Sequence, residues 1–138
     1  MRVSISAGSG LLRAMVTGEF ALEEAQRTFL EILEAVARHS TDKILLDGRD
    51  LTGDPTTIQR FLFSAFTAQA VMSYRRAHRA ARALQFAYVL QEPVLDPQRF
   101  GETVAVNRGM WVKVFDNPED ALGWLRDAPA NTPAVGDA

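Results

Sequence analysis

Asp47, Arg49 and Asp50 are the first residues whose types and spacing suggest chemistry, because two carboxylates and a guanidinium follow a short apolar run. The run Lys43–Asp47 lies between two helical patterns, which is typical of a central parallel strand buried on both faces. Open α/β sheets bind ligands at the carboxyl ends of such strands, so these three residues are candidate ligand contacts. The competing interpretation is local: Arg49 pairs with the two aspartates, and Asp50 starts a turn.

The helix expected over residues 57–82 has two apolar faces. One set of apolar residues predicts a stripe against the core: Ile58, Phe61, Leu62, Ala65, Phe66 and Met72. A second set, Phe63, Ala70 and Tyr74, points well away from the first and needs a partner of its own. Three partners are open: a second copy across a two-fold axis, an apolar ligand in a pocket reached past Phe66, or another part of the chain. We favour the dimer interface.

Charged side chains elsewhere indicate no catalytic or metal site. Arg75, Arg79 and Arg82 are expected on one face near the end of that helix, where cations complement the helix dipole or meet an acidic partner. His39 and His78 lie in different predicted helices without the spacing of metal ligands. The sequence has no cysteine, nucleophile elbow, phosphate loop or dinucleotide fingerprint. We therefore expect neither an enzyme nor a cofactor.

The composition is that of one globular domain. Of 138 residues, 47% are hydrophobic and 23% are charged, which excludes general disorder. A net charge of -2, with no aromatic residues among the arginines, argues against nucleic-acid binding. No apolar run approaches the roughly 20 residues that span a bilayer, and the first residues do not resemble a signal peptide. We expect a cytoplasmic protein with a domain at residues 1–126 and a disordered tail at residues 127–138.

Periodicity and turn residues give the order of the elements that must position these side chains. A hairpin is expected first, with strands at residues 3–7 and 11–17 around a Gly-Ser-Gly turn. Helices are then expected at residues 21–39, 57–82, 96–107 and from 118, and strands at residues 43–47, 84–90 and 111–115. The order ββαβαβαβα predicts an α/β fold with a mixed, mostly parallel sheet, one antiparallel edge strand and flanking helices.

Several short strings, in this order and spacing, carry a resemblance to a known family. They are Leu45-Leu46-Asp47, Arg49-Asp50-Leu51-Thr52-Gly53, Phe100-Gly101, Val112-Lys113-Val114-Phe115 and Glu119-Asp120-Ala121-Leu122-Gly123-Trp124-Leu125. Over about residues 3–126 the chain resembles the STAS domains of anti-sigma factor antagonists, and more closely their SpoIIAA-like branch of small bacterial proteins with no assigned activity. The resemblance implies frequent dimers and a binding or regulatory role instead of catalysis.

The resemblance also implies a candidate phosphorylation switch. Phosphorylated members of the family carry Asp-Ser-Ser/Thr-Gly at the start of the helix after the third strand, and the matching stretch here is Asp54–Ile58. Thr56 and Thr57 occupy the place of the acceptor, whereas Pro55 and Ile58 depart from the motif on either side. A phosphate at a helix N-terminus is favourable. The alternative is that these threonines only cap the helix.

We therefore expect a non-enzymatic interaction or regulatory module that acts as a homodimer and binds a protein partner whose identity the sequence does not encode. The alternative is a carrier or sensor of a lipid-like or other small apolar ligand. That alternative depends on the aromatic residues of the long helix and on a fold-level likeness of this branch to lipid-binding domains. A cavity of roughly several hundred Å³ near Phe66 would favour the carrier, and a flat apolar patch on the same helix would favour the module.

Overall fold

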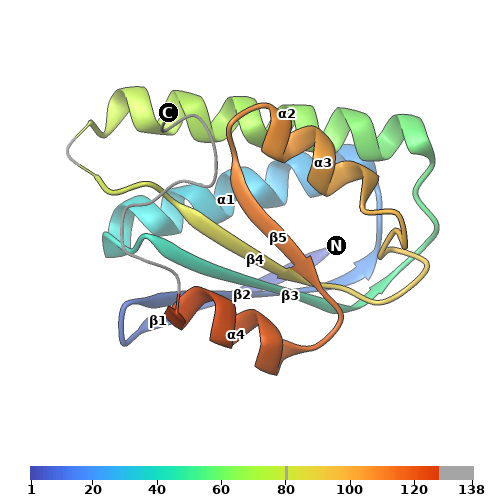
Figure 1. Cartoon of the computed structure of the whole chain (residues 1–138), viewed down its shortest axis with the longest axis horizontal. Coiled ribbons are helices and arrows are strands. Elements are labelled where there is room, and N and C mark those ends of the chain that lie inside the picture. Colours follow the sequence, from blue (N-terminus) through green and yellow to red (C-terminus); the bar gives the residue numbers. More distant parts are fainter. Residues whose placement is uncertain (80, 128–138) are drawn as a thin grey trace.

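The computed structural model describes residues 1–79 and 81–127, which form a five-stranded sheet with helices on both faces (Figure 1). The elements in chain order are β1 (Arg2–Gly8), β2 (Leu11–Glu19), α1 (Leu22–His39), β3 (Lys43–Thr52), α2 (Thr57–Ala77), β4 (Gln85–Val89), α3 (Phe100–Asn107), β5 (Trp111–Phe115) and α4 (Pro118–Asp127). This order confirms the predicted one. Asp127 still belongs to α4, and the rest of the predicted tail lies outside the described residues.

The sheet has the predicted mixed topology. Its strand order is β1-β2-β3-β4-β5; β1 pairs with β2 antiparallel, and every other pair is parallel. The β1–β2 hairpin turns at Ser9 and Gly10, which have φ values of 55° and 75°. Positive φ at both central residues is the two-residue turn whose twist matches the twist of the strands.

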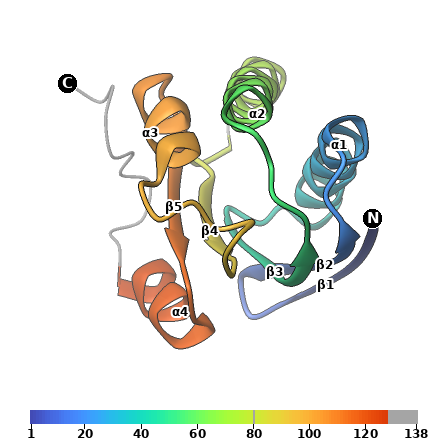
Figure 2. The ribbon, with the colours of Figure 1, turned by 90° about the vertical axis from the view of Figure 1, so that its right-hand side faces the viewer.

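Alternation along the strands divides the core into two layers. Helices α1, α2 and α3 cover one face of the sheet and α4 covers the other, as Figure 2 shows. Leu46 packs in the layer beneath the three helices, whereas its neighbour Leu45 packs in the layer beneath α4. Neighbouring residues of a strand point to opposite faces, so each central strand supplies both layers and must be apolar throughout.

Strand β3 is longer than predicted. It continues beyond Asp47 to Thr52, because residues 50–52 pair with residues 17–19 of β2 after a shift in register. The following loop therefore begins at Gly53, and Asp50 lies within a strand, where the prediction of a turn is wrong.

Helix α2 turns a different face to the core from the one predicted. Its inward side consists of the buried Ser64, Thr67, Ala68 and Val71, with Phe63, Ala70 and Tyr74 packed against the same core. Four of the six residues in the predicted core stripe are instead exposed, whereas Ala65 and Phe66 are half-buried. The exposed four are Ile58 (67% exposed), Phe61 (37%), Leu62 (43%) and Met72 (44%). That prediction is wrong because both faces are apolar, and the inward one is the less hydrophobic of the two.

The C-terminal end of α2 also differs from its prediction. The helix ends at Ala77 because His78 leaves the helical conformation and closes the last turn with a backbone hydrogen bond. Arg79 and Arg82 therefore follow the helix and do not share a helical face with Arg75.

Helix α3 begins at Phe100, later than the Asp-Pro pair predicted. Residues 96–99 form a turn, and the Asp96 carboxylate accepts hydrogen bonds from the backbone N–H groups of Gln98 (3.1 Å) and Phe100 (2.9 Å). Asp96 thus still satisfies a donor at the helix start, as a cap does. Gly109, two residues after the end of α3, has a φ of 92°, which is typical of the glycine that follows a helix.

Candidate functional site

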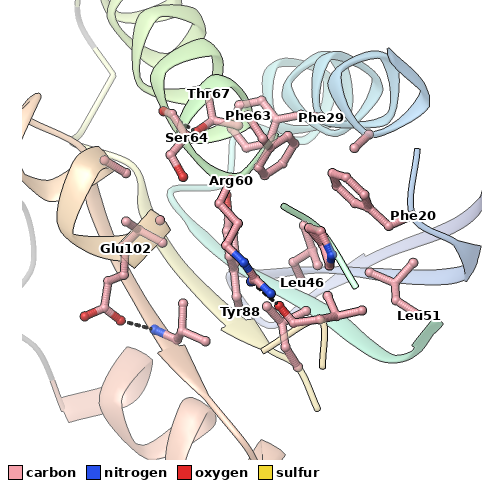
Figure 3. Close-up of a pocket in the computed structure, with 18 of the residues that line it drawn as sticks. Phe20, Phe29, Leu46, Leu51, Arg60, Phe63, Ser64, Thr67, Tyr88 and Glu102 are labelled. Atoms are coloured by element: carbon pink, nitrogen blue, oxygen red, sulfur yellow. Dashed lines mark hydrogen bonds between the residues drawn. The ribbon is translucent and has the colours of Figure 1, made fainter. Parts of the chain in front are cut away.

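A cavity of about 130 Å³ lies between the sheet and helices α1, α2 and α3 (Figure 3). It is partly open to solvent and lies where the parallel strands end, since Leu51, Leu90 and Val114 line it. Ligands of open α/β sheets bind at this end of the strands. The cavity is smaller than the several hundred Å³ that a drug-sized ligand needs.

Three phenylalanine side chains form the apolar wall of the cavity. Phe63 extends from α2 and meets the rings of Phe20 and Phe29 edge to face, with ring centroids 6.4 Å apart in both pairs. Figure 3 shows Phe63 beside Phe29 and above Phe20, close to the sheet. Edge-to-face packing holds the three rings in place and leaves their apolar surface toward the cavity.

A row of residues across three strands lines the cavity on the sheet side. Tyr88 of β4 is the register partner of Leu46 in β3 and of Val114 in β5, and all three line the cavity. Their side chains share one face because the register aligns them and the strand period is two residues. The wall contains large side chains, whereas α3 contributes only Gly101, Glu102 and Ala105. Gly101 and Ala105 are small, and their lack of a large side chain leaves the space of the cavity.

The charged residues of the lining are engaged with the protein itself. The Arg60 guanidinium donates to the carbonyls of Val94 (2.7 Å) and Pro93 (2.8 Å), which fixes the loop after β4. Glu102 accepts a hydrogen bond from the backbone N–H of Val114 (2.6 Å), drawn as a dashed line in Figure 3. Arg99 donates to the backbone carbonyl of Asp96 (3.2 Å).

Asp96 is a further charged residue of the lining whose side chain is hydrogen-bonded within the protein. Its carboxylate accepts the two backbone hydrogen bonds described above, and the bond from Phe100 is the main reason that the pKa of Asp96 is lower than usual. The lowered pKa keeps this carboxylate charged, and its charge is already stabilised by backbone donors.

The Tyr88 hydroxyl differs from these hydrogen-bonded charged groups of the lining. It is buried and has no hydrogen-bond partner among the described residues. Burial raises the pKa of Tyr88 well above its usual range, and the nearby Thr67 hydroxyl only partly opposes that effect. The Thr67 hydroxyl itself donates to the carbonyl of Ser64 (3.0 Å). A buried polar group without a partner is costly, so Tyr88 marks a polar position in an otherwise apolar wall.

The outer face of α2 is a second candidate site, which we define by Ile58, Phe61, Leu62 and Met72. All four are large apolar side chains that are more than a third exposed. The Arg108 guanidinium lies 5.4 Å from the centroid of the Phe61 ring and covers part of it. Helix α2 contains no acidic residue, and Arg75 and Arg76 lie in its last turn. The surface is therefore apolar along its length and basic at its C-terminal end.

Comparison with solved structures shows what this arrangement is similar to. An anti-sigma factor antagonist from Mycobacterium paratuberculosis superimposes with a TM-score of 0.54 at 15% sequence identity, over 91% of this chain and 94% of that chain. The chain has the STAS fold. The NMR structure of the protein TM1081 gives a TM-score of 0.48 at 17% identity, over 90% of this chain and 88% of that one. No protein-family model and no curated protein matches the sequence.

Within the STAS fold, Asp47 and Arg49 form a local ion pair away from the cavity. The Arg49 guanidinium donates to both carboxylate oxygens of Asp47, at 3.0 Å and 2.8 Å, and this bond is the main reason that the pKa of Asp47 is lowered. Asp47 falls on the same side of β3 as Leu45, which faces α4. Neither residue lines the cavity, and nor do Asp50 and Phe66, so ligand contact at these four residues stays a prediction.

The predicted dimer residues lie on the inward side of α2. Phe63 is part of the cavity wall, and Ala70 and Tyr74 pack against the core. The Tyr74 ring also stacks on the His78 ring, with centroids 4.1 Å apart. A dimer interface formed by these residues stays a prediction.

Thr56 is the N-cap of α2. Its hydroxyl accepts a hydrogen bond from the backbone N–H of Gln59 (3.1 Å), and the Gln59 side chain accepts one from the backbone N–H of Thr56 (2.9 Å). This reciprocal pair is a capping box, which satisfies two donors at the helix start. Thr57 is the first helical residue and is exposed. Phosphorylation of either threonine stays a prediction.

The described residues hold neither a metal cluster nor a membrane span. Across residues 1–79 and 81–127, no cluster of three or more histidine, aspartate or glutamate side chains could hold a metal ion. Within the same part of the chain, no helix has the length and apolar character of a membrane span.

The sequence pointed to one residue of the cavity wall, Phe63, for which an apolar ligand pocket was one of three interpretations, but it did not point to Phe20 or Tyr88. Phe20 precedes the first helix, and Tyr88 lies in a segment for which only a strand is predicted. One signal was present: Ser64 and Thr67 are small polar residues on the otherwise apolar face of α2 that carries Phe63. Polar residues on an inward face indicate a place where the packing is incomplete or specialised.

Proposed function

We propose that this protein is a non-enzymatic regulatory module that acts by binding another protein chain through the outer face of α2. The observation that carries the proposal is the row of exposed apolar side chains along one face of that helix, led by Ile58 at 67% exposed. Several large apolar side chains exposed on one helix face are typical of an interaction site. A solved protein that shares this fold is named an anti-sigma factor antagonist, which is itself a name for a regulator of another protein.

The occupant that we propose for this face is a second copy of the chain. A two-fold axis would run two α2 helices antiparallel, so Arg75 and Arg76 of one copy would approach the start of the helix in the other. Asp54 lies just before that start, with its side chain 80% exposed. Opposite charges would therefore meet at both ends of an apolar centre. The proposal includes a cytoplasmic homodimer that presents its remaining surface to a further protein partner.

The test is native mass spectrometry with size-exclusion chromatography on the wild type and two matched variants. Leu62→Glu introduces a charge into the outer face of α2, and Leu30→Glu introduces the same charge on α1, where the leucine is equally exposed at 43%. We expect a wild-type dimer, a folded Leu62→Glu monomer and a Leu30→Glu dimer. A wild-type monomer, or a dimer that persists in Leu62→Glu, contradicts the proposed interface.

A second candidate function is a carrier or sensor of a small apolar ligand. The cavity is smaller than the several hundred Å³ expected for a carrier and is not lined by Phe66, so its apolar wall and its position support this function and its size limits it to a small ligand. The Phe20, Phe29 and Phe63 side chains give the cavity an apolar wall, and it lies at the end of the sheet where such ligands bind. The same native mass spectra test this function. A small adduct that is retained on the folded chain and lost on denaturation supports it.

A further inference from the structure

We infer that the cavity binds a small neutral molecule made of one ring, or a short branched alkyl group, with a single polar atom placed against Tyr88. This inference rests on the carrier function proposed above and specifies the class of its ligand. It is independent of the proposed interface on α2. Size, charge and the position of one polar group each narrow the class.

The volume of the cavity sets the size of the ligand. An engineered apolar cavity of about 150 Å³ in another protein holds a benzene molecule, and the volume here is about 130 Å³. A single ring therefore fits, whereas a phospholipid or a long acyl chain does not. The facing rings of Phe20, Phe29 and Phe63 favour an aromatic ligand, because aromatic rings pack well edge to face.

The lining favours a ligand without charge. Its charged side chains already hold backbone groups: Arg60 the carbonyls of Pro93 and Val94, Glu102 the N–H of Val114, and Asp96 the N–H of Phe100. A charged ligand would have to break one of these contacts or remain unpaired in an apolar wall. An unpaired charge in such surroundings is strongly unfavourable.

The Tyr88 hydroxyl sets the position of the one polar atom. It is buried and lacks a partner among the described residues, and Tyr88 is one of the residues that line the cavity. The nearby Thr67 hydroxyl donates its own proton to the Ser64 carbonyl and is not placed to form a hydrogen bond with Tyr88. A ligand with one hydroxyl or carbonyl group would supply the missing partner, and the remainder of that ligand would contact the phenylalanine rings.

The experiment compares toluene with p-cresol, which adds one hydroxyl group to the same ring. Dissociation constants are measured by NMR titration for the wild type, Tyr88→Phe and Tyr74→Phe. Tyr74→Phe changes the other tyrosine of the chain, which does not line the cavity. We expect both compounds to shift the amide signals of Leu46, Ala105 and Val114. We expect the preference for p-cresol over toluene to fall roughly fivefold in Tyr88→Phe only, which corresponds to the loss of one neutral hydrogen bond.

Each other outcome overturns a defined part of the proposal. If neither compound shifts the signals of the cavity residues, both the carrier function and this inference are wrong. If toluene binds in the cavity but Tyr88→Phe leaves the preference unchanged, the carrier function stands and the assigned polar position is wrong. If dodecanoate binds more tightly than both ring compounds, the size and charge that we infer are wrong.

Discussion

Gly101 of α3 approaches Ser64 of α2 so closely that a β-carbon on Gly101 would lie 2.9 Å from the Ser64 hydroxyl oxygen. Real β-carbons essentially never come within 3.0 Å of a non-bonded heavy atom from another part of the chain. Both residues line the cavity, so this contact sets how near α3 lies to α2 along one side of it. Glycine is required here for close approach, and its backbone conformation is an ordinary helical one.

Gly101→Ala should therefore destabilise the protein, although alanine is the better helix former. Overpacking of a buried contact costs about 1–3 kcal/mol, which exceeds the roughly 1 kcal/mol that alanine gains over glycine in a helix. Urea unfolding of the wild type and the variant measures the difference. A second change, Ser64→Ala, removes the oxygen that the new β-carbon meets, so the double variant should recover most of the loss.

Gly123 provides the matched control for this prediction. It lies in α4, and a β-carbon added there would have an Arg126 nitrogen as its nearest neighbour, at an ordinary contact distance of 3.8 Å. Gly123→Ala should raise stability by up to about 1 kcal/mol through helix propensity alone. Two alanine variants that change stability in the same direction would contradict the close contact at Gly101.

Because of the capping box, replacing Thr56 or Thr57 with alanine should lower the free energy of unfolding by different amounts. Thr56→Ala removes the hydroxyl that accepts from Gln59 and should lower the free energy of unfolding by about 1 kcal/mol. Thr57→Ala, at the exposed first helical position, should change it by less than about half of that. Thermal unfolding of both variants measures the contrast. Equal effects would show that the capping box contributes nothing.

Strong local signals made most of the fold predictable from the sequence. The Asn117-Pro118 pair marks the start of α4, where the Asn117 side chain accepts from the backbone N–H of Asp120 (2.9 Å), and the Gly-Ser-Gly turn marks the hairpin. Each of these signals acts within a few residues, so neighbouring sequence is sufficient to read it. The alternation of strands and helices then permits few topologies.

Contacts between distant parts of the chain decide two features that local sequence predicts wrongly, the end of β3 and the inward face of α2. Asp50 is a turn-forming residue and predicts a turn, but pairing with β2 holds residues 50–52 in a strand. Hydrophobicity alone predicts that the side of α2 with Ile58 faces the core, whereas in the structure the side with Ser64 does. The side of α2 with Ser64 faces inward because α2 packs against α1 and α3, and a small side chain such as Ser64 lets α3 approach closely.

The place and most of the lining of the cavity were beyond prediction for the same reason, although a ligand pocket against Phe63 was one of the open interpretations. It forms where residues from distant parts of the chain meet: Phe20 before α1, Phe63 in α2 and Tyr88 in β4. None of these residues belongs to a motif, and each has an ordinary structural role in its own segment. Only the register of the sheet and the placement of the helices show that they share one space.

The Asp47–Arg49 ion pair predicts a loss of stability in acid. The pKa of Asp47 is lower in the folded state than in the unfolded chain, where an aspartate usually has a pKa of about 4. The ionised Asp47 therefore adds its full contribution to the free energy of unfolding above about pH 4. That contribution is lost as the pH falls through the lower folded pKa. Arg49→Gln removes the main cause of that lowered pKa. Urea unfolding from about pH 6 to about pH 2.5 should therefore show a shallower acid decline in Arg49→Gln than in the wild type. Parallel declines would contradict the role of this pair.

Tyr88 predicts the opposite dependence in alkali. Burial raises its pKa in the folded state, whereas a tyrosine in an unfolded chain ionises near pH 10. Its contribution to stability is therefore complete below about pH 10 and falls as the pH rises above that value, because unfolding then releases a proton. The pKa of Tyr74 is also raised by burial, so the wild type should lose stability in alkali through both tyrosines.

Tyr88→Phe separates this effect from packing. The variant keeps the ring and removes only the unpartnered hydroxyl, so near neutral pH it should be at least as stable as the wild type. Urea unfolding from about pH 8 to about pH 11 should show a smaller alkaline decline in Tyr88→Phe than in the wild type. A variant that is markedly less stable at neutral pH would mean that the hydroxyl has a partner in solution. In that case a bound water satisfies Tyr88, and the polar position in the cavity is already occupied.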